Sequence, residues 1–460
     1  MPEALVGRRK EMLILENQFR SEGSSLVAVT GRRHSGKTAL LTYFASRHPN
    51  TLYFPAREEP ASRNLAYFRR AAGEFLNDPS AAADADWNRT FRALVGGRRS
   101  QKVVVIIDDF DRIGRKDPSF PPLVRYIWDT VLRNSRTMLV LSGSSFAEME
   151  RQVTDYDAPL FAAMTARIDV RPLAYEACRE LLGGEKAGNA LEYYAAAGGT
   201  PLFLKRLALH QSVSEGISEE LLVPGGSLCR EPMEALRAEV ADPGVYVSVM
   251  TSIATGHRRL LDISEDLGIP QTGLTSYLAN LVSAGIAERE VPVPGGGKKG
   301  RYCLSDSLSE IWFGCVNPNL ALLETGRRSA LTAMISAKLR DDMVPRAYRR
   351  ACTERLWEMS SSGVWDFALT EAGGWWDREA EIGVCGYDAS GRNLVAGDCS
   401  LRGRPKGLQD IEELEAASER AARQLRAGAV YWVIFSPDGF DRELEARAAS
   451  DQRIRLVPLE

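Results

Sequence analysis

The sequence has 460 residues, of which 44% are apolar and 26% charged, and its formal net charge is −3. A chain of this length is too long for one compact core, so about two to four domains are expected. The near balance of charge excludes a bulk attraction to nucleic acid or to an anionic membrane. Any contact with DNA therefore needs a local basic patch.

Cysteine and histidine usage gives no sign of a disulfide framework or a zinc site. The seven cysteines include no Cys-x-x-Cys pair, and the four histidines are scattered along the chain. Residues 1–12 lack the apolar segment of a signal peptide, and no run approaches about 20 apolar residues. We therefore expect a cytoplasmic protein without a membrane-spanning segment.

Strand and helix patterns alternate over residues 1–175. Apolar runs rich in Val, Ile and Leu lie at 26–30, 51–54, 103–107 and 138–142, with amphipathic segments between them. This alternation predicts a parallel α/β sheet covered by helices. The later patterns divide into helices at 176–235, three helices with a strand pair at 236–320, and mixed strand and helix at 321–460.

A phosphate-binding motif follows the first apolar run. Its eight residues fit the pattern G-x-x-x-x-G-K-[ST] between a strand and a helix: Gly31, Arg32, Arg33, His34, Ser35, Gly36, Lys37 and Thr38. Glycines let backbone N–H groups approach phosphate closely, and the next helix points its positive end at the same anion. Lys37 can reach the β- and γ-phosphates, and the Thr38 hydroxyl can ligate Mg²⁺. The motif predicts a site for ATP with Mg²⁺.

Two aspartates follow the run at 103–107. Asp108 ends a predicted parallel strand, beside the phosphate crevice, and is the expected second Mg²⁺ ligand. Asp109 stands where ATPases with this motif usually place a glutamate that activates water. Asp109 and Lys37 are the expected catalytic residues. Since a displacement of about 1 Å can cost on the order of 100-fold in rate, we expect normal ATP binding and slow hydrolysis.

Hydroxyl groups end the run at 138–142. Ser142 can hydrogen-bond the γ-phosphate or the attacking water, which makes it a candidate nucleotide-binding residue. The serines at 142–145 could instead cap the helix that follows. The sequence leaves both interpretations open.

An ordered set of motifs resembles the archaeal-type AAA+ ATPases, which belong with the signal-transduction ATPases having numerous domains. The motifs lie at 5–11, 31–38, 108–110, 142–145 and 198–202. The resemblance implies a P-loop core at 1–175, a helical lid at 176–235, a winged helix-turn-helix at 236–320, and a restriction-endonuclease-like domain at 321–460. Ala162 and Ala163 stand where the family carries Gly-Arg, and Arg167 is a nearby candidate for the missing arginine.

The region at 236–320 could contact DNA or could be a packing module. Its third helical pattern, at 272–284, offers short polar groups and almost no Lys or Arg. The predicted hairpin supplies Lys298, Lys299 and Arg301, which could meet phosphates. Contact with DNA and docking on the ATPase or on a protein partner remain open alternatives.

The C-terminal region lacks the acidic and basic groups that the resemblance implies for a nuclease. That chemistry needs two carboxylates for a divalent metal and a lysine for the attacking water. Gly383 stands in the aspartate position, and residues 398–400 are Asp-Cys-Ser where Glu-x-Lys is expected. Glu354 and Glu381 are the remaining carboxylates. We therefore expect a binding or scaffolding role for this region and no nuclease activity.

These observations together predict a slow ATP-dependent molecular switch, coupled to DNA or to a protein partner through its winged helix. One alternative is a DNA-binding regulator for which ATP is only a structural ligand. A metal-dependent nuclease is the other.

Overall fold

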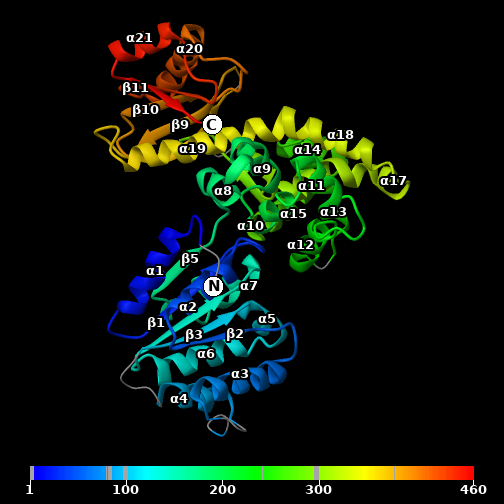
Figure 1. Cartoon of the computed structure of the whole chain (residues 1–460), viewed down its shortest axis with the longest axis vertical. Coiled ribbons are helices and arrows are strands. Elements are labelled where there is room, and N and C mark those ends of the chain that lie inside the picture. The colour runs from blue at the N-terminus through cyan, green and yellow to red at the C-terminus, as the bar shows by residue number, and fades with distance from the viewer. Residues whose placement is uncertain are drawn as a thin grey trace.

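The computed structural model describes residues 5–459, except 79, 81–84, 97–101, 241, 295–299 and 378. Figure 1 shows an α/β lobe that contains the N-terminus, a helical middle part, and a second α/β lobe at the C-terminal end. None of the helices in these described ranges combines the length and the apolar character needed to cross a membrane.

The N-terminal lobe is built on the predicted parallel sheet. Its strand order is β2-β3-β4-β1-β5, and every neighbouring pair is parallel. The strands are β1 (Ser25–Thr30), β2 (Thr51–Pro55), β3 (Val103–Asp108), β4 (Thr137–Ser142) and β5 (Ala166–Asp169). The sequence did not predict β5, because this edge strand alternates between exposed and buried residues instead of forming an apolar run.

Helices cover both faces of this sheet, which explains why β3 and β4 are buried along their whole length. Val104 and Ile106 face one apolar cluster, while Val105 and Ile107 face another. The helices of this lobe are α1 (Arg9–Arg20), α2 (Lys37–Arg47), α3 (Ala61–Leu76), α4 (Trp87–Gly96), α5 (Phe110–Lys116), α6 (Phe120–Ile127) and α7 (Phe146–Met149).

The middle part begins with helices that follow the first sheet. They are α8 (Tyr175–Leu182), α9 (Ala190–Ala197), α10 (Pro201–Leu207), α11 (Val213–Glu220) and α12 (Glu231–Glu239). Three helices and an antiparallel strand pair come next: α13 (Gly244–Ala254), α14 (Leu260–Leu267), α15 (Gln271–Ser283), β6 (Ala287–Glu290) and β7 (Arg301–Leu304). Helix α15 buries Leu274, Leu278 and Leu281 on one face. Lys298 and Lys299 lie outside the described residues.

Further helices connect the middle part to the C-terminal sheet. They are α16 (Ser307–Ile311), α17 (Leu320–Glu324), α18 (Arg328–Lys338) and α19 (Val344–Ser361). Helix α19 lies between the middle helices and the second sheet (Figure 1). One continuous apolar cluster includes Tyr194 of α9, Ala351 of α19 and Val384 of the second sheet. The middle part and one face of the C-terminal sheet therefore share a core.

The C-terminal sheet is mixed, in the order β12-β11-β10-β9-β8. The pairs β8–β9 and β9–β10 are antiparallel, whereas β10–β11 and β11–β12 are parallel. Its elements are β8 (Leu369–Trp376), β9 (Glu381–Asp388), β10 (Asn393–Asp398), α20 (Leu408–Leu425), β11 (Ala429–Ser436), α21 (Arg442–Ser450) and β12 (Ile454–Pro458). Trp375 and Trp376 are both buried at the end of β8, in agreement with a packing role.

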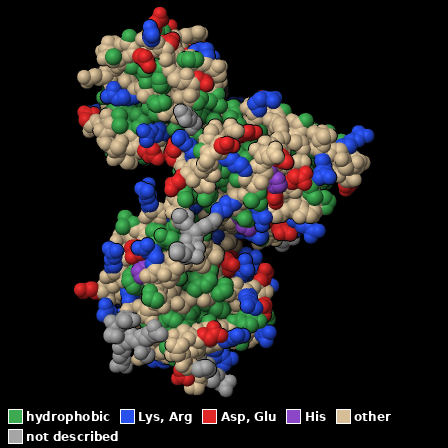
Figure 2. Space-filling view, viewed as in Figure 1, with side chains coloured by type: hydrophobic (Ala, Val, Ile, Leu, Met, Phe, Trp, Pro, Cys, Tyr) green, Lys and Arg blue, Asp and Glu red, His purple; other side chains and the backbone are tan. Residues whose placement is uncertain are grey.

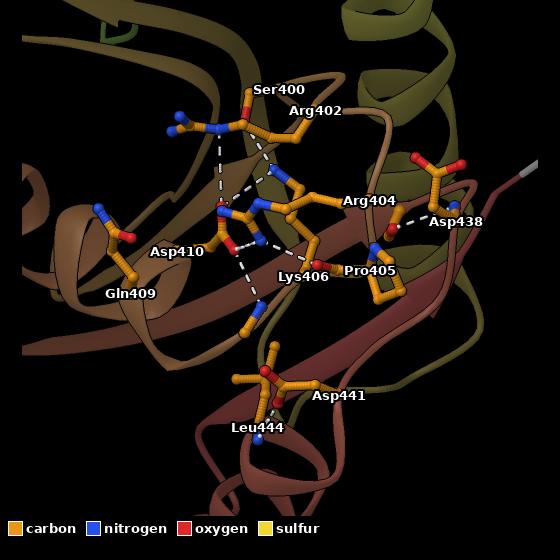
Figure 3. A network of polar contacts seen from close by, with 12 residues as sticks. Ser400, Arg402, Arg404, Pro405, Lys406, Gln409, Asp410, Asp438, Asp441 and Leu444 are labelled. Carbon is orange, nitrogen blue, oxygen red and sulfur yellow. Dashed lines mark hydrogen bonds and ion pairs between the residues drawn. The ribbon is translucent and has the colours of Figure 1, made fainter.

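A buried lysine joins the end of β10 to the start of α20 (Figure 3). The Lys406 side chain is 1% exposed, and its Nζ donates to Asp398 Oδ2 at 2.5 Å and to Ser400 Oγ at 2.6 Å. The same Nζ lies 3.6 Å from Asp410 Oδ1, and Asp410 also accepts hydrogen bonds from the Arg404 guanidinium. One ammonium group therefore compensates two carboxylates where the loop turns into the helix.

Replacing this lysine is expected to destabilise the C-terminal part strongly. The substitution Lys406→Ala removes the buried partner of Asp398 and one of the cations beside Asp410, and breaking such a buried pair typically costs about 3–5 kcal/mol. The exposed Arg402, which also contacts Asp410, is the control, and Arg402→Ala should cost about 1 kcal/mol or less. Urea denaturation measures both values, and equal midpoints for the two variants would contradict the role given to Lys406.

Candidate functional site

The loop of residues 31–38 joins β1 to α2 and needs its glycines. A Cβ atom on Gly31 would lie 2.5 Å from the carbonyl oxygen of Val170, so any larger residue would collide with backbone. Gly36, with φ of 97°, is the N-cap of α2, and no side chain caps this helix. His34 also has a positive φ, of 62°. The loop therefore wraps tightly in front of the positive end of α2.

The ammonium group of Lys37 is held inside this loop. Its Nζ donates to the carbonyl oxygens of Gly31 and Arg32, both at 2.8 Å. Burial lowers the pKa of Lys37 to about 8, although attraction to Asp109 and Asp108 opposes this shift. In the part of the chain that the structure describes, the hydrogen-bond partners of this cation are neutral carbonyls, so an anion that entered the loop would be a stronger partner.

Asp108 is the centre of a group of hydroxyl donors at the carboxyl ends of the strands. Its Oδ2 accepts from Thr38 Oγ1 at 2.8 Å and from the Tyr53 hydroxyl, and its Oδ1 accepts from the Ser142 hydroxyl. Asp108 is only 3% exposed. Burial, followed by the charge of Asp108, raises the pKa of Tyr53, so the phenol remains a donor. The structure thus brings Thr38, Asp108 and Ser142 together.

The sequence patterns did not indicate Tyr53 as a site residue. It lies on β2, the neighbour of β3 in the sheet, two residues before the end of the strand. Parallel strands end at one edge, so a polar side chain near the end of β2 could have been considered. The order of the strands, which a sequence pattern does not supply, was the missing information.

Asp109 directly follows β3 and adopts a left-handed conformation with φ of 57°. Its Oδ2 lies 3.0 Å from Nη2 of Arg112. Burial raises the pKa of Asp109, and the Arg112 guanidinium opposes this effect. The carboxylate that the sequence assigns to water activation is therefore paired with an arginine of α5.

Arg32, the second residue of the loop, contacts the strand pair of the middle part. Its Nη2 lies 2.6 Å from Oε1 of Glu288 in β6, and its Nη1 donates to the carbonyl oxygen of Ser305, which follows β7. These contacts link positions more than 250 residues apart in the sequence. The strand pair therefore reaches the phosphate loop directly.

Glu231, the first residue of α12, contacts the next two loop residues. Its Oε1 lies 3.6 Å from Nε of Arg33 and 3.0 Å from Nε2 of His34. On the opposite side, Nη2 of the buried Arg8 donates to the Ser35 carbonyl oxygen at 2.7 Å. Two carboxylates from later parts of the chain, Glu231 and Glu288, thus stand at the mouth of the loop. Sequence patterns gave no signal for either.

The residues present fit a nucleoside triphosphate with Mg²⁺. The Ser35 Oγ is buried and has no hydrogen-bond partner among the described residues. Such an orphaned donor beside a buried ammonium is suited to a phosphate oxygen. The carboxylate of Asp108 and the hydroxyl of Thr38 are hard oxygen ligands of the kind that Mg²⁺ prefers.

Two other candidate residues lie elsewhere. Arg167 is in β5, where its guanidinium stacks over the ring of Phe161 at 4.5 Å. Glu354 accepts hydrogen bonds from the Tyr175 N–H at 2.8 Å and the Tyr194 hydroxyl at 2.7 Å. Glu354 therefore fastens α19 to α8 and α9 and is not free for a metal site.

The other candidates of the C-terminal part lie on β9 and at the end of β10. Glu381 pairs with Arg349 at 2.7 Å. A Cβ atom on Gly383 would lie 2.6 Å from the Cys399 sulfur, which therefore fills the space beside this glycine. Asp398 is held by Lys406, as described above.

Comparison with known proteins agrees with this geometry. Residues 5–207 match the family model of an ATPase domain predominantly from Archaea, and residues 312–411 match one of archaeal and bacterial proteins of unknown function. An uncharacterized protein of Methanocaldococcus jannaschii is 27% identical over 379 residues, which cover 82% of this chain and 83% of that protein.

A solved structure with a TM-score above 0.5 supports the same fold. The Walker-type ATPase of Pyrococcus abyssi is similar with a TM-score of 0.55 and 19% identity, over 67% of this chain and 96% of that chain. The ORC2 protein of Aeropyrum pernix, solved in ADPNP and ADP complexes, has a TM-score of 0.43 and 14% identity, over 75% and 96%. With the loop between β1 and α2, the match to the archaeal ATPase model identifies residues 5–207 as an archaeal-type P-loop ATPase domain.

Proposed function

We propose that the chain binds ATP with Mg²⁺ at residues 31–38 and acts as a slow ATP-dependent switch. The observation that carries this proposal is the contact of Glu288 and Glu231 with the side chains of the phosphate loop. A triphosphate brings several negative charges to the same place. It must therefore compete with these two carboxylates for the loop cations.

The binding step uses groups that are already close together. Lys37 exchanges its carbonyl partners for the β- and γ-phosphates, and Ser35 supplies a further hydroxyl donor. Thr38 and Asp108 would hold Mg²⁺, which, when bound, neutralises part of the phosphate charge. Ser142 lies at the same edge of the sheet and is the proposed partner of the γ-phosphate or of the attacking water.

The switching step transmits this exchange to the C-terminal part. Arg301 of β7 lies 3.3 Å from Glu381 of β9, and the Val293 N–H donates to the carbonyl oxygen of Gly374 in β8 at 2.9 Å. The strand pair β6–β7 thus contacts the phosphate loop through Glu288 and the second sheet through Arg301. Release of Arg32 by Glu288 would loosen the attachment of β6–β7 to the phosphate loop and keep its attachment to the second sheet.

Hydrolysis is proposed to be slow for two reasons. The Asp109 side chain is one methylene shorter than glutamate, and it is paired with Arg112. Ala162 and Ala163 also supply no arginine for the charge that develops on the transferred phosphate. A slow reaction suits a switch, because the triphosphate-bound arrangement then lasts long enough to act on a partner.

Direct DNA binding is the weaker of the two candidate outputs. Arg301 is occupied by Glu381 and also stacks over the Trp376 ring at 4.5 Å. Lys and Arg side chains are scattered over the visible face in Figure 2 and do not gather into one patch. We therefore propose that β6–β7 couples the ATPase to the C-terminal part or to a protein partner. ATP-independent, tight DNA binding would favour the DNA-binding regulator instead.

ATP binding is expected to weaken as the pH rises above about 8. Burial lowers the pKa of Lys37 to about 8, and a bound phosphate favours the ammonium form, so binding in alkaline solution must take up a proton. Calorimetry at pH 8.5 in two buffers of different ionisation enthalpy measures this uptake.

Two variants serve as controls for the role of Lys37. Lys37→Arg stays charged and should take up fewer protons than the wild type, while Lys37→Ala should lose about 10- to 100-fold in affinity. The exposed Lys10→Ala should bind ATP normally. Proton uptake that is equal in the wild type and Lys37→Arg would show that Lys37 is not the titrating group.

Lengthening the candidate base is expected to speed hydrolysis. Asp109→Glu brings the carboxylate about one methylene closer to the water and should raise phosphate release roughly tenfold. Asp109→Asn, whose side chain also tolerates a left-handed backbone, should not raise it. A single-turnover phosphate-release assay compares the two, and an unchanged rate in Asp109→Glu would refute this explanation of slow turnover.

Removing the competing carboxylate is expected to strengthen ATP binding. Glu288→Gln weakens the ion pair with Arg32, and since such half-exposed pairs are worth at most about 1 kcal/mol, affinity should rise about two- to fivefold. Glu290→Gln, on the same strand and exposed, is the matched control. Weaker binding in Glu288→Gln than in the control would mean that Glu288 supports the nucleotide and does not compete with it.

A further inference from the structure

A second cavity, of about 490 Å³, lies between the ATPase part and the middle helices. It is lined by residues of α7, α12, α13 and α15 and of the stretches that follow α12 and α15: Ala147, Glu239, Val240, Asp242, Val245, Tyr246, Tyr277, Asn280, Ser283 and Ala284. Its polar lining consists of Glu239, Asp242, Tyr246, Tyr277, Asn280 and Ser283. None of these residues belongs to the phosphate loop or contacts it, so the cavity is separate from the nucleotide site.

Two tyrosine rings form a fixed aromatic corner of this cavity. The rings of Tyr246 and Tyr277 meet edge to face, with centroids 5.1 Å apart and an interplanar angle of 77°. Asn280 Nδ2 donates to the Tyr246 hydroxyl at 2.9 Å. Because α13 carries one ring and α15 the other, the corner is set by the packing of these two helices.

The charge of the cavity is negative. Its lining contains the carboxylates of Glu239 and Asp242 and no Lys, Arg or His. Glu239 accepts a hydrogen bond from Ser145 Oγ at 2.9 Å. Burial raises the pKa of Glu239, and the Ser145 hydrogen bond and the charge of Arg115, which donates to the carbonyl oxygen of Ala238 at 3.3 Å, oppose that rise.

We propose that this cavity binds a small organic cation, with an alkylammonium or guanidinium group placed between the tyrosine corner and the two carboxylates. Aromatic faces attract such cations, most strongly where water is partly excluded. Carboxylates supply charge-assisted hydrogen bonds to the same group. A cavity of this size holds a small metabolite, and its mixed aromatic and acidic lining discriminates against neutral and anionic ones.

Helix α12 connects this cavity to the phosphate loop. Its first residue, Glu231, contacts Arg33 and His34 of the loop, and its last residue, Glu239, lines the cavity. The Ser145 hydroxyl donates to Glu239, and the Ser145 N–H donates to Asp111 Oδ2 of α5 at 3.2 Å. A cation that holds Glu239 would keep α12 docked and so weaken ATP binding, an effect that rests on the proposed function. Because coupling between two sites is reciprocal, ATP would weaken binding of the cation by the same factor.

Calorimetry of the full chain with putrescine tests the site without nucleotide. The expected result is saturable binding that the neutral isostere 1,4-butanediol does not show. Tyr277→Ala should weaken binding at least tenfold, and the exposed Asp242→Asn should weaken it about two- to fivefold. Tyr246→Phe, which keeps the ring, and Thr275→Ala, on the same helix outside the cavity, should leave binding unchanged. Equal binding of the diol, or unchanged putrescine affinity in both Tyr277→Ala and Asp242→Asn, would overturn the proposal.

Two further arms identify the source of the cation and separate the site from the switch. The tripeptide Gly-Lys-Gly presents the same ammonium group on a polypeptide, and it should bind more weakly than putrescine. Tighter binding of the tripeptide than of putrescine would overturn the proposal that the ligand is a small free cation and not a polypeptide side chain. Lys37→Ala should bind putrescine normally even though its affinity for ATP is reduced about 10- to 100-fold. In the wild type, saturating ATP should lower the affinity for putrescine severalfold. An affinity for putrescine that ATP does not change would refute the coupling through α12.

Discussion

The ion pair between Arg32 of the phosphate loop and Glu288 of β6 is the contact on which the proposed mechanism depends. The loop is built to hold an anion, because it combines a buried ammonium, a serine hydroxyl with no hydrogen-bond partner among the described residues, and a helix whose N-cap is a glycine. In this arrangement the chain supplies its own carboxylates, at Glu288 and Glu231, to the cations at the mouth of the loop. The site that would receive a triphosphate is therefore also the place where distant parts of the chain are attached to the ATPase part.

These attachments matter because the distant parts are themselves joined. A single apolar core runs from the middle helices through α19 to one face of the C-terminal sheet. Glu354 of α19 adds two hydrogen bonds to the helices next to the ATPase part, and Arg301 links β7 to β9. A change at the phosphate loop would therefore act on a connected body and not on one flexible segment. The stability of that body in turn depends on buried groups such as Lys406, which compensates Asp398 at the end of β10 and Asp410 of α20.

Local patterns were sufficient to predict the first sheet, apart from its edge strand, and the phosphate loop. The motif at 31–38 is contiguous, and Asp108 and Ser142 were found because parallel strands end at one edge of a sheet. Tyr53, Glu231 and Glu288 could not be found this way, since their approach to the loop depends on strand order and on packing between segments far apart in sequence. The C-terminal part shows the same limit: Ser400 stands where a lysine is expected, and the buried Lys406 that reaches it comes from the following loop.

A structure of the full chain with Mg²⁺ and a non-hydrolysable ATP analogue in the loop tests the central claim most directly. The quantity to measure is the separation of Arg32 Nη2 from Glu288 Oε1, which is 2.6 Å here. Competition by the triphosphate predicts that this pair is broken and that the guanidinium faces a phosphate oxygen. An intact pair at its present separation beside a bound triphosphate would contradict the proposed coupling between nucleotide and the distant parts of the chain.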